Sequence, residues 1–159
     1  MRIVAFDVGE VRIGIAVCDQ SEIAGFPVGV VTRLGSLKRD IALVTSVLVE
    51  QDADAVLIGL PLSLNGDEGP QALRVRGFAK ALSKEITLPI VFWDESLSSV
   101  EATERMIAQG VSRERRRKLV DQMAASIILE SYLAHRSNTG SLRDGIAYSD
   151  CAFNASLAN

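Results

Sequence analysis

Short runs of β-branched and aromatic residues open the chain. Those at 2–8, 12–18 and 25–33 predict three buried strands. A short link that contains glycine separates the first two runs, which favours an antiparallel hairpin. Pro27 has no backbone N–H to donate to a neighbour, so it fits best near the start of its strand or on an edge of the sheet. The chain is therefore expected to begin with a three-stranded meander.

Helical and strand-like patterns alternate after this meander. The chain is expected to form a helix, a strand, a helix and a strand at 36–50, 54–61, 71–86 and 88–96. Ser36 is the expected N-cap of the first of these helices, and Pro70 suits the first turn of the second. The segment 63–70 is expected to be a loop, because Asn65-Gly66 is a turn signal.

Two more helices are expected after the fifth strand. Ser98 and Glu101 have the spacing of a capping box and predict a helix over 98–110. Gly110 is its expected C-cap. The last helix is predicted over 112–135, and it is basic first and apolar later.

This order of elements predicts an α/β fold. Three strands in a meander, followed by alternating helices and strands, give a mixed five-stranded sheet that is antiparallel first and then parallel, flanked by helices. We expect one domain over 1–137 and a C-terminal tail over 138–159. The tail has no convincing periodicity, which leaves its order open.

Composition and charge narrow the class of protein. The 159 residues are 48% apolar and 23% charged and carry a net charge of −3, which is ordinary for one globular domain. No global basic field points to nucleic acid, although a local basic patch is compatible with this charge. The N-terminus lacks the pattern of a signal peptide, and no apolar run approaches membrane-spanning length. We therefore expect a cytoplasmic protein with no membrane partner.

Cysteine and histidine are too few for several kinds of site. Cys18 and Cys151 form no CxxC pair, which argues against a disulfide scaffold or a structural zinc site. The single histidine, His135, excludes a histidine-rich metal site. A Ser-His-Asp triad would have to use His135, whose place among polar residues late in a helix favours a solvated, non-catalytic role.

Acidic residues follow two of the predicted strands. Asp7 lies near the end of the first strand, and Asp94 and Glu95 lie at the end of the fifth. Functional groups gather outside the carboxyl ends of parallel strands, so these side chains converge if the strands are neighbours. Asp121 continues an apolar face of the last helix, where small residues such as Ala125 would allow close approach to the sheet.

Three inward carboxylates without histidine suit a hard cation such as Mg²⁺ or Mn²⁺. Like charges held close together repel unless a cation neutralises them. A two-metal centre of this kind can hydrolyse a phosphodiester. Structural alternatives stay open: Asp7 could hydrogen-bond the hairpin turn, and Asp121 could pair with Arg117. Asp94 and Glu95 could cap the following helix.

Two further segments are candidates for binding phosphate. The run "RERRRK" at 113–118 can hold a nucleic-acid backbone, or it can be a solvated helix start. Basic charge early in a helix opposes the macrodipole, which favours the first interpretation. The loop "GLPLSLNGDEGP" precedes a helix and could offer backbone amides, but Asp67 and Glu68 would repel a phosphate unless they point away. A plain loop with a helix cap is the alternative.

Four motifs occur together and in order: "DVGEVRIGIAVCD" (7–19), "IGLPLSLNGDEGPQA" (58–72), "VFWDESLSSVEA" (91–102) and "GVSRERRRKLVDQMAASIILESYL" (110–133). Over residues 1–135 the chain resembles the YqgF family, also called RuvX. The resemblance implies a ribonuclease-H-like fold. It also implies a Mg²⁺- or Mn²⁺-dependent nuclease that processes the 5′ end of the small-subunit ribosomal RNA precursor or, like the resolvase RuvC, cleaves Holliday junctions.

The resemblance implies a role for individual residues. Asp7, Glu95 and Asp121 are implied as catalytic metal ligands. Arg12 is retained from the family, and the charge of the basic run favours Arg113, Arg115, Arg116, Arg117 and Lys118 as further nucleic-acid-binding residues. The chain departs from the family at Val11 and Ser96, where a cation is usual. Both departures put substrate contact in doubt and leave the acidic set intact.

Three functions stay open on the sequence. The first is the nuclease, which acts on an RNA precursor or on branched DNA. The second is a nucleic-acid-binding module with little catalysis, which the departures at Val11 and Ser96 favour. The third is a phosphotransferase related to sugar kinases, which would need a second domain that this length does not allow. A junction resolvase needs two active sites, so a homodimer is a further possibility.

Overall fold

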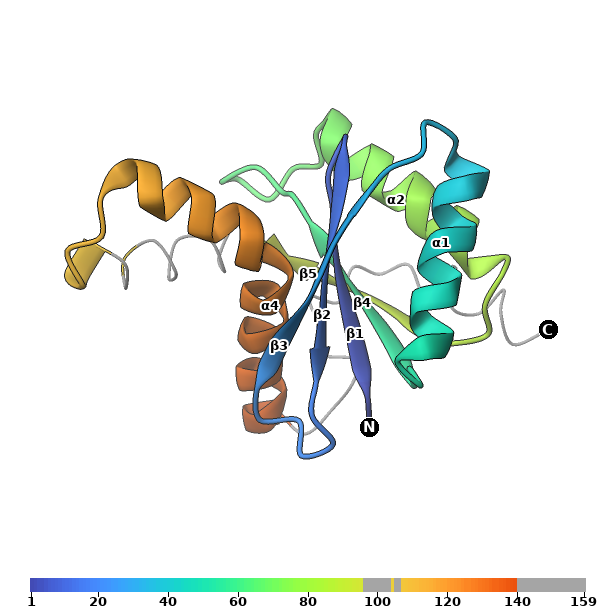
Figure 1. Ribbon diagram of the computed structural model, residues 1–159, viewed down its shortest axis with the longest axis horizontal. Coiled ribbons are helices and arrows are strands. Elements are labelled where there is room, and N and C mark those ends of the chain that lie inside the picture. The colour runs from blue at the N-terminus through green and yellow to red at the C-terminus, as the bar shows by residue number, and fades with distance from the viewer. Residues whose placement is uncertain (96–103, 105–106, 140–159) are drawn as a thin grey trace.

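Figure 1 shows a single sheet with helices on both of its faces. The structure is a computed structural model that describes residues 1–95, 104 and 107–139. Within the last helix it describes the backbone alone at 117, 118, 120–122 and 139. No helix in this described part is both long enough and apolar enough to cross a membrane.

The sheet has five strands in the order β3-β2-β1-β4-β5. In chain order they are β1 (Ile3–Val8), β2 (Arg12–Cys18), β3 (Gly25–Thr32), β4 (Ala55–Leu60) and β5 (Ile90–Asp94). The first three pair antiparallel, and β4 is parallel to both β1 and β5. The predicted mixed sheet is confirmed, with each strand end within two residues of its predicted position. Pro27 lies on the edge strand β3, as expected.

Two helices cover one face of the sheet, and a long one covers the other. Helix α1 (Leu37–Glu50) and helix α2 (Pro70–Ser83) share the first face, and α4 (Arg113–Thr139) lies on the second. Pro70 is in the first turn of α2, as predicted. Ser36 is at the N-cap position of α1, but its side chain makes no capping hydrogen bond.

The C-terminal predictions are tested in part. Helix α4 continues four residues beyond its predicted end at His135. Residues 107 and 108 are helical, and Gly110 has a φ of +72°, as expected of a helix C-cap. The capping box at Ser98 and Glu101 lies outside the described residues. So does nearly all of the 138–159 tail, and the domain boundary at 137 stays a prediction.

Alternation along β1 determines which face carries the acid. Val4, Phe6 and Val8 pack in the core under α1 and α2. Ile3 and Ala5 pack in the second core, against α4. Because successive side chains of a strand point to opposite faces, Asp7 continues the row that faces α4. The carboxylate therefore lies where the α4-side core ends, at the carboxyl edge of the sheet.

Candidate carboxylate site

Asp7 and Glu95 meet across the carboxyl edge of the sheet. Asp7 is on β1 and Glu95 follows directly after β5, with β4 between these two parallel strands. Their side chains share a hydrogen bond. Burial, the charge of Asp7, that hydrogen bond and the charge of Asp94 together raise the pKa of Glu95 to about 8, and burial contributes most. The predicted convergence of the two acids is confirmed.

Gly59 on β4 makes room for this meeting. A Cβ at position 59 would lie 2.9 Å from Oε2 of Glu95 and 2.6 Å from Cδ1 of Ile128 on α4. Both distances are shorter than real Cβ contacts. The absence of a side chain on the middle strand therefore lets the Glu95 carboxylate reach across β4 toward Asp7, and it lets α4 pack beside the pair.

Helix α4 approaches the site through a small residue. A Cβ at Gly14, which pairs with Asp7 in the β1–β2 ladder, would lie 3.6 Å from Cβ of Ala125 and 3.6 Å from Cβ of Asp7. The predicted close approach of the helix at Ala125 is thus confirmed. Position 121 is one helical turn before Ala125, and the side chain of Asp121 lies outside the described part of the structure.

The acids present fit a hard divalent cation. The two carboxyl groups share one hydrogen bond, and both burial and the charge of Asp7 disfavour the ionised form of Glu95. A cation with oxygen ligands would replace that proton and balance both charges. Among the side chains that the structure describes, no three acidic, histidine or cysteine groups come together, and Asp121 is not one of those side chains.

The hairpin that follows Asp7 is fixed from two sides. Its turn is closed by the N–H of Gly9, which donates to the carbonyl of Arg12 at 2.9 Å. Arg33 reaches in from the end of β3 and donates from Nη1 to the carbonyl of Gly9 at 3.0 Å. From α2, the Gln71 side chain donates to the carbonyl of Val8 at 3.3 Å. These contacts hold the end of β1, and hence Asp7, in place.

Arg33 is itself held by a buried acid that the sequence did not reveal as part of the site. Its Nε donates to Oδ2 of Asp40 at 2.8 Å, and the N–H of Leu34 donates to Oδ1 at 2.7 Å. Asp40 is 2% exposed. Burial by itself raises the pKa of Asp40, but the bonds from Leu34 and Arg33 outweigh burial and lower the pKa. The sequence did offer one indication of this pair: Asp40 lies in the first turn of the predicted helix, seven residues after Arg33.

The structure describes some of the side chains that are predicted to bind nucleic acid. Arg12 is exposed in the hairpin beside the acids, next to Val11, which is 66% exposed. At the start of α4, Arg113 and Arg115 are exposed. Arg116 is half-buried and donates to the carbonyl of Val111 at 2.6 Å.

The remaining basic predictions fall outside what the structure describes. The side chains of Arg117 and Lys118 are not among the described ones, and Ser96 lies in the segment 96–103 that is left undescribed. In Figure 1 helix α4 begins well to the side of the sheet, at about the level of the β1–β2 hairpin, and its later part runs along the second face. The basic run and Arg12 therefore belong to the same end of the molecule as Asp7 and Glu95.

The loop between β4 and α2 is poorly suited to phosphate. Glu68 forms a two-pronged pair with Arg76, from Nε to Oε1 at 2.7 Å and to Oε2 at 2.8 Å, so its charge is balanced. Asp67 keeps its charge beside the start of α2 and accepts a hydrogen bond from Asn65 at 2.8 Å. A phosphate at this helix start would meet the Asp67 carboxylate.

His135 and Cys18 have structural environments. His135 is exposed, as expected, and its ring is tilted against Trp93 with centroids 5.2 Å apart. Trp93 also donates from Nε1 to Oγ of Ser131 at 3.1 Å, so β5 is joined to α4. Cys18 is a buried free thiol, and the N–H of Ile3 donates to its sulfur at 3.2 Å. Cys151 lies outside the described residues.

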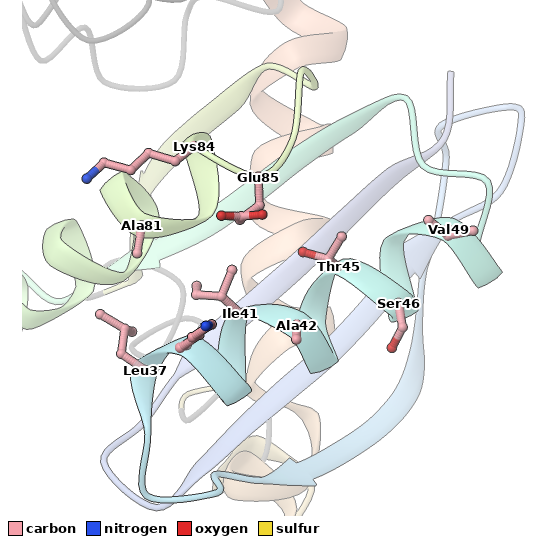
Figure 2. Close-up of a pocket in the computed structure, with 10 residues that line it drawn as sticks. Leu37, Ile41, Ala42, Thr45, Ser46, Val49, Ala81, Lys84 and Glu85 are labelled. Carbon is pink, nitrogen blue, oxygen red and sulfur yellow. The ribbon is translucent and has the colours of Figure 1, made fainter.

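An apolar groove lies on the opposite face of the sheet. Figure 2 shows it between α1 and α2, and its volume is about 650 Å³. Among its described lining residues, Glu85 carries the only carboxylate. Metal-assisted hydrolysis needs paired acids, so the carboxylate edge of the sheet is a better candidate for an active site than the groove.

Comparisons with known proteins agree on one family. The family model for RuvX, described as Holliday junction resolvase, matches residues 1–135. A Myxococcus xanthus protein named as a pre-16S rRNA nuclease is 41% identical over 137 residues, which are 86% of this chain and 90% of that protein. A Desulforudis audaxviator protein of the same name is 36% identical over 138 residues, 87% of this chain and 97% of the relative.

Solved structures support the fold. Thermus thermophilus RuvC in complex with a Holliday junction substrate has a TM-score of 0.55 and 18% sequence identity. The match covers 87% of this chain and 98% of that one. This likeness identifies the fold as ribonuclease-H-like, as the sequence motifs implied.

Proposed function

The chain belongs to the RuvX family, and from this premise we propose that it is a metal-dependent nuclease which hydrolyses phosphodiester bonds near the 5′ end of pre-16S ribosomal RNA. The observation that carries the proposal is the Asp7–Glu95 pair at the carboxyl edge of the sheet. The relatives that cover most of this chain are named for that substrate. Such a role in ribosome maturation belongs in the cytoplasm.

The acidic residues would act together on a divalent cation. Asp7, Glu95 and Asp121 would hold Mg²⁺ or Mn²⁺. Bound there, the cation supplies activation of the attacking water and stabilisation of the leaving oxygen. Glu95, whose carboxyl group shares a hydrogen bond with Asp7, would serve as a ligand in its ionised form. Asp94 adds negative charge beside Glu95 and supports the site.

Arginine side chains would hold the substrate backbone. Arg12 lies in the hairpin next to Asp7, and the basic run at the start of α4 lies toward the same end of the sheet. Arginine binds phosphate through charge and paired hydrogen bonds, without reading sequence. We propose that Arg12, with Arg113 and its basic neighbours on α4, orients the phosphodiester over the acids.

Branched DNA is the second candidate substrate. The structural similarity to RuvC motivates this candidate. At 18% sequence identity, that similarity supports the fold and not the substrate. A four-way junction has two symmetric strands to cut, so a resolvase of this kind would act as a homodimer. Val11, exposed where a cation is usual, favours a third candidate, a binding module with weak catalysis.

A cleavage assay separates these candidates. The wild type and Asp7→Asn would be incubated with labelled RNA that spans the 5′ end of 16S rRNA, with single-stranded DNA and with a four-way junction, each with Mg²⁺, Mn²⁺ or chelator. We expect metal-dependent cleavage of the RNA and a loss of at least about 100-fold in Asp7→Asn, because a metal ligand is removed. Asp52→Asn, an exposed substitution at the end of α1, is the matched control.

Each outcome bears on a different part of the proposal. Cleavage of the junction in preference to RNA selects the resolvase. Salt-sensitive binding without cleavage selects the binding module. Cleavage that survives both Asp7→Asn and chelation excludes the carboxylate site.

Thermal unfolding tests cation binding independently of cleavage. Glu95→Gln replaces a buried acid that must be protonated beside Asp7 with a neutral group that can still donate to Asp7. We expect the metal-free variant to be more stable than the wild type by about 1–2 kcal/mol, or about 3–6 °C in Tm. Mn²⁺ should raise the Tm of the wild type and not that of Glu95→Gln. Glu85→Gln, which is exposed in the groove on the other face, should behave as the wild type does.

A further inference from the structure

The loop that joins β4 to α2 carries an apolar side chain that is fully exposed. Leu64 is 101% exposed, more than any other large apolar residue that the structure describes. Leu62, two positions earlier, is buried against the core under α1 and α2. The loop thus buries the side chain of Leu62 in the core and exposes the side chain of Leu64 to solvent.

Hydrogen bonds within the loop keep Leu64 from folding back. The N–H of Ser63 donates to the carbonyl of Asp67 at 3.0 Å, and the N–H of Gly66 donates to the carbonyl of Ser63 at 2.8 Å. Gly66 has a φ of +85°, a conformation that glycine adopts without strain. A short turn closed in this way presents the residues at its tip outward.

The loop is also fixed to the strand that carries Glu95. Leu62 and Glu68 form a β-bridge across its base, and Glu68 pairs with Arg76. The Arg76 guanidinium lies over the ring of Phe92 on β5, 4.9 Å from its centroid. The loop base is therefore tied to β5, two residues before the acidic end of that strand.

The tip lies at the edge of the sheet that holds the acids. Strand β4 leads directly into the loop after Leu60, which pairs with Asp94. Gly59, one residue earlier, adjoins the Glu95 carboxylate. In Figure 1 the loop leaves the sheet at the end where the β1–β2 hairpin turns. A polymer that passes over Asp7 and Glu95 passes this loop.

We propose that Leu64 contacts the bases of the nucleic acid substrate next to the cleaved bond and disturbs their stacking. The proposal rests on the nuclease function. The charge of Asp67 makes the loop a poor partner for phosphate, whereas an exposed aliphatic side chain gains free energy against the face of a base or between two bases. The backbone contacts then come from arginines, and the base contact comes from Leu64.

Fluorescence of 2-aminopurine reports this contact directly. The base analogue would be placed one nucleotide to either side of the mapped cleavage site in the preferred substrate, and binding would be followed in chelator. The proteins are the wild type, Leu64→Ala and Ile23→Ala. Ile23 is 79% exposed in the loop between β2 and β3, at the opposite end of the sheet, so it matches the loss of exposed apolar surface.

The inference predicts a specific pattern. Binding of wild type and Ile23→Ala should raise the fluorescence, because the analogue brightens when it is unstacked. Leu64→Ala should lose that rise and bind about 5- to 20-fold more weakly. Its Tm should equal that of the wild type, since the removed atoms touch solvent.

Other results overturn the inference. If Leu64→Ala binds the substrate and brightens the analogue as the wild type does, Leu64 does not contact the bases. If the wild type binds and cleaves but never brightens the analogue, the inference fails while the nuclease function stands. If the wild type neither binds nor cleaves nucleic acid, both fail, and that result is visible without any variant.

Discussion

Asp40 and Glu95 are both shielded from water, and burial is the largest influence on the pKa of each. At Asp40, hydrogen bonds from Leu34 and Arg33 outweigh burial, so the pKa falls below its ordinary value of 3.8. At Glu95, the charge of Asp7 adds to burial, so the pKa rises. Asp40 is stabilised as an anion by the protein itself. The ionised form of Glu95 would instead be stabilised by added positive charge, which is the difference between a structural acid and a candidate metal ligand.

Asp40→Asn should destabilise the protein in a pH-dependent way. The folded-state pKa of Asp40 is lowered, so its stabilisation is present above about pH 4 and is lost as pH falls through the folded value. We expect a loss of about 2 kcal/mol at neutral pH, because a buried ion pair with Arg33 is broken. Urea unfolding at a series of pH values down to about 3 should show the difference between wild type and variant shrinking. If the difference in unfolding free energy between wild type and Asp40→Asn stays constant with pH, the ionised form of Asp40 is not what stabilises the fold. Asp52→Asn, an exposed substitution, is the control.

At the scale of the elements, two glycines determine how α4 and β4 enclose the acids. Gly59 and Gly14 lie on neighbouring parts of the sheet under α4, but a side chain would meet different surroundings at each. At Gly59 the nearest atoms are 2.6 Å and 2.9 Å away, whereas at Gly14 the nearest are at 3.6 Å, an ordinary contact. The two positions therefore form a matched pair that separates crowding of Glu95 from a general effect of alanine.

Gly59→Ala should impair both stability and cleavage, and Gly14→Ala should impair neither strongly. The new methyl group at position 59 must displace Ile128 and Glu95, at a cost of about 1–3 kcal/mol. Because Glu95 moves, kcat should fall by about tenfold or more. Urea unfolding and the RNA cleavage assay measure the two effects. Equal effects of the two alanines would show that the spacing at Gly59 does not position Glu95.

The element scale also shows what the sequence could predict. Runs of β-branched and apolar residues predicted the strands to within two residues, and Asp7 and Glu95 were found because parallel strands place their carboxyl ends together. The link from Arg33 to Asp40 was missed because both look like surface charges until the chain turns from β3 into α1. Leu73 was counted among the apolar positions of α2 and yet is 60% exposed, which the helical period alone does not reveal.

At the scale of the whole molecule, net charge and local charge differ in sign. The chain carries −3 overall, so a polyanion is repelled on average and must be held by a local patch. Arg113 and Arg115 are exposed at the start of α4, at the end of the molecule that holds the acids. Nucleic-acid binding should therefore weaken steeply with salt, in proportion to the few phosphates that this patch neutralises.

Replacing Arg113 and Arg115 by alanine should reduce that salt dependence. Each phosphate contact on a single strand contributes about 0.7 to the slope of log K against log salt concentration, so the slope should fall by about 1.4. Lys38→Ala with Arg39→Ala removes two exposed charges from α1 on the other face and should leave the slope unchanged. Fluorescence anisotropy over a salt series measures both. If the two double variants lower the slope equally, the patch is not the contact surface, and the polyanion responds only to net charge.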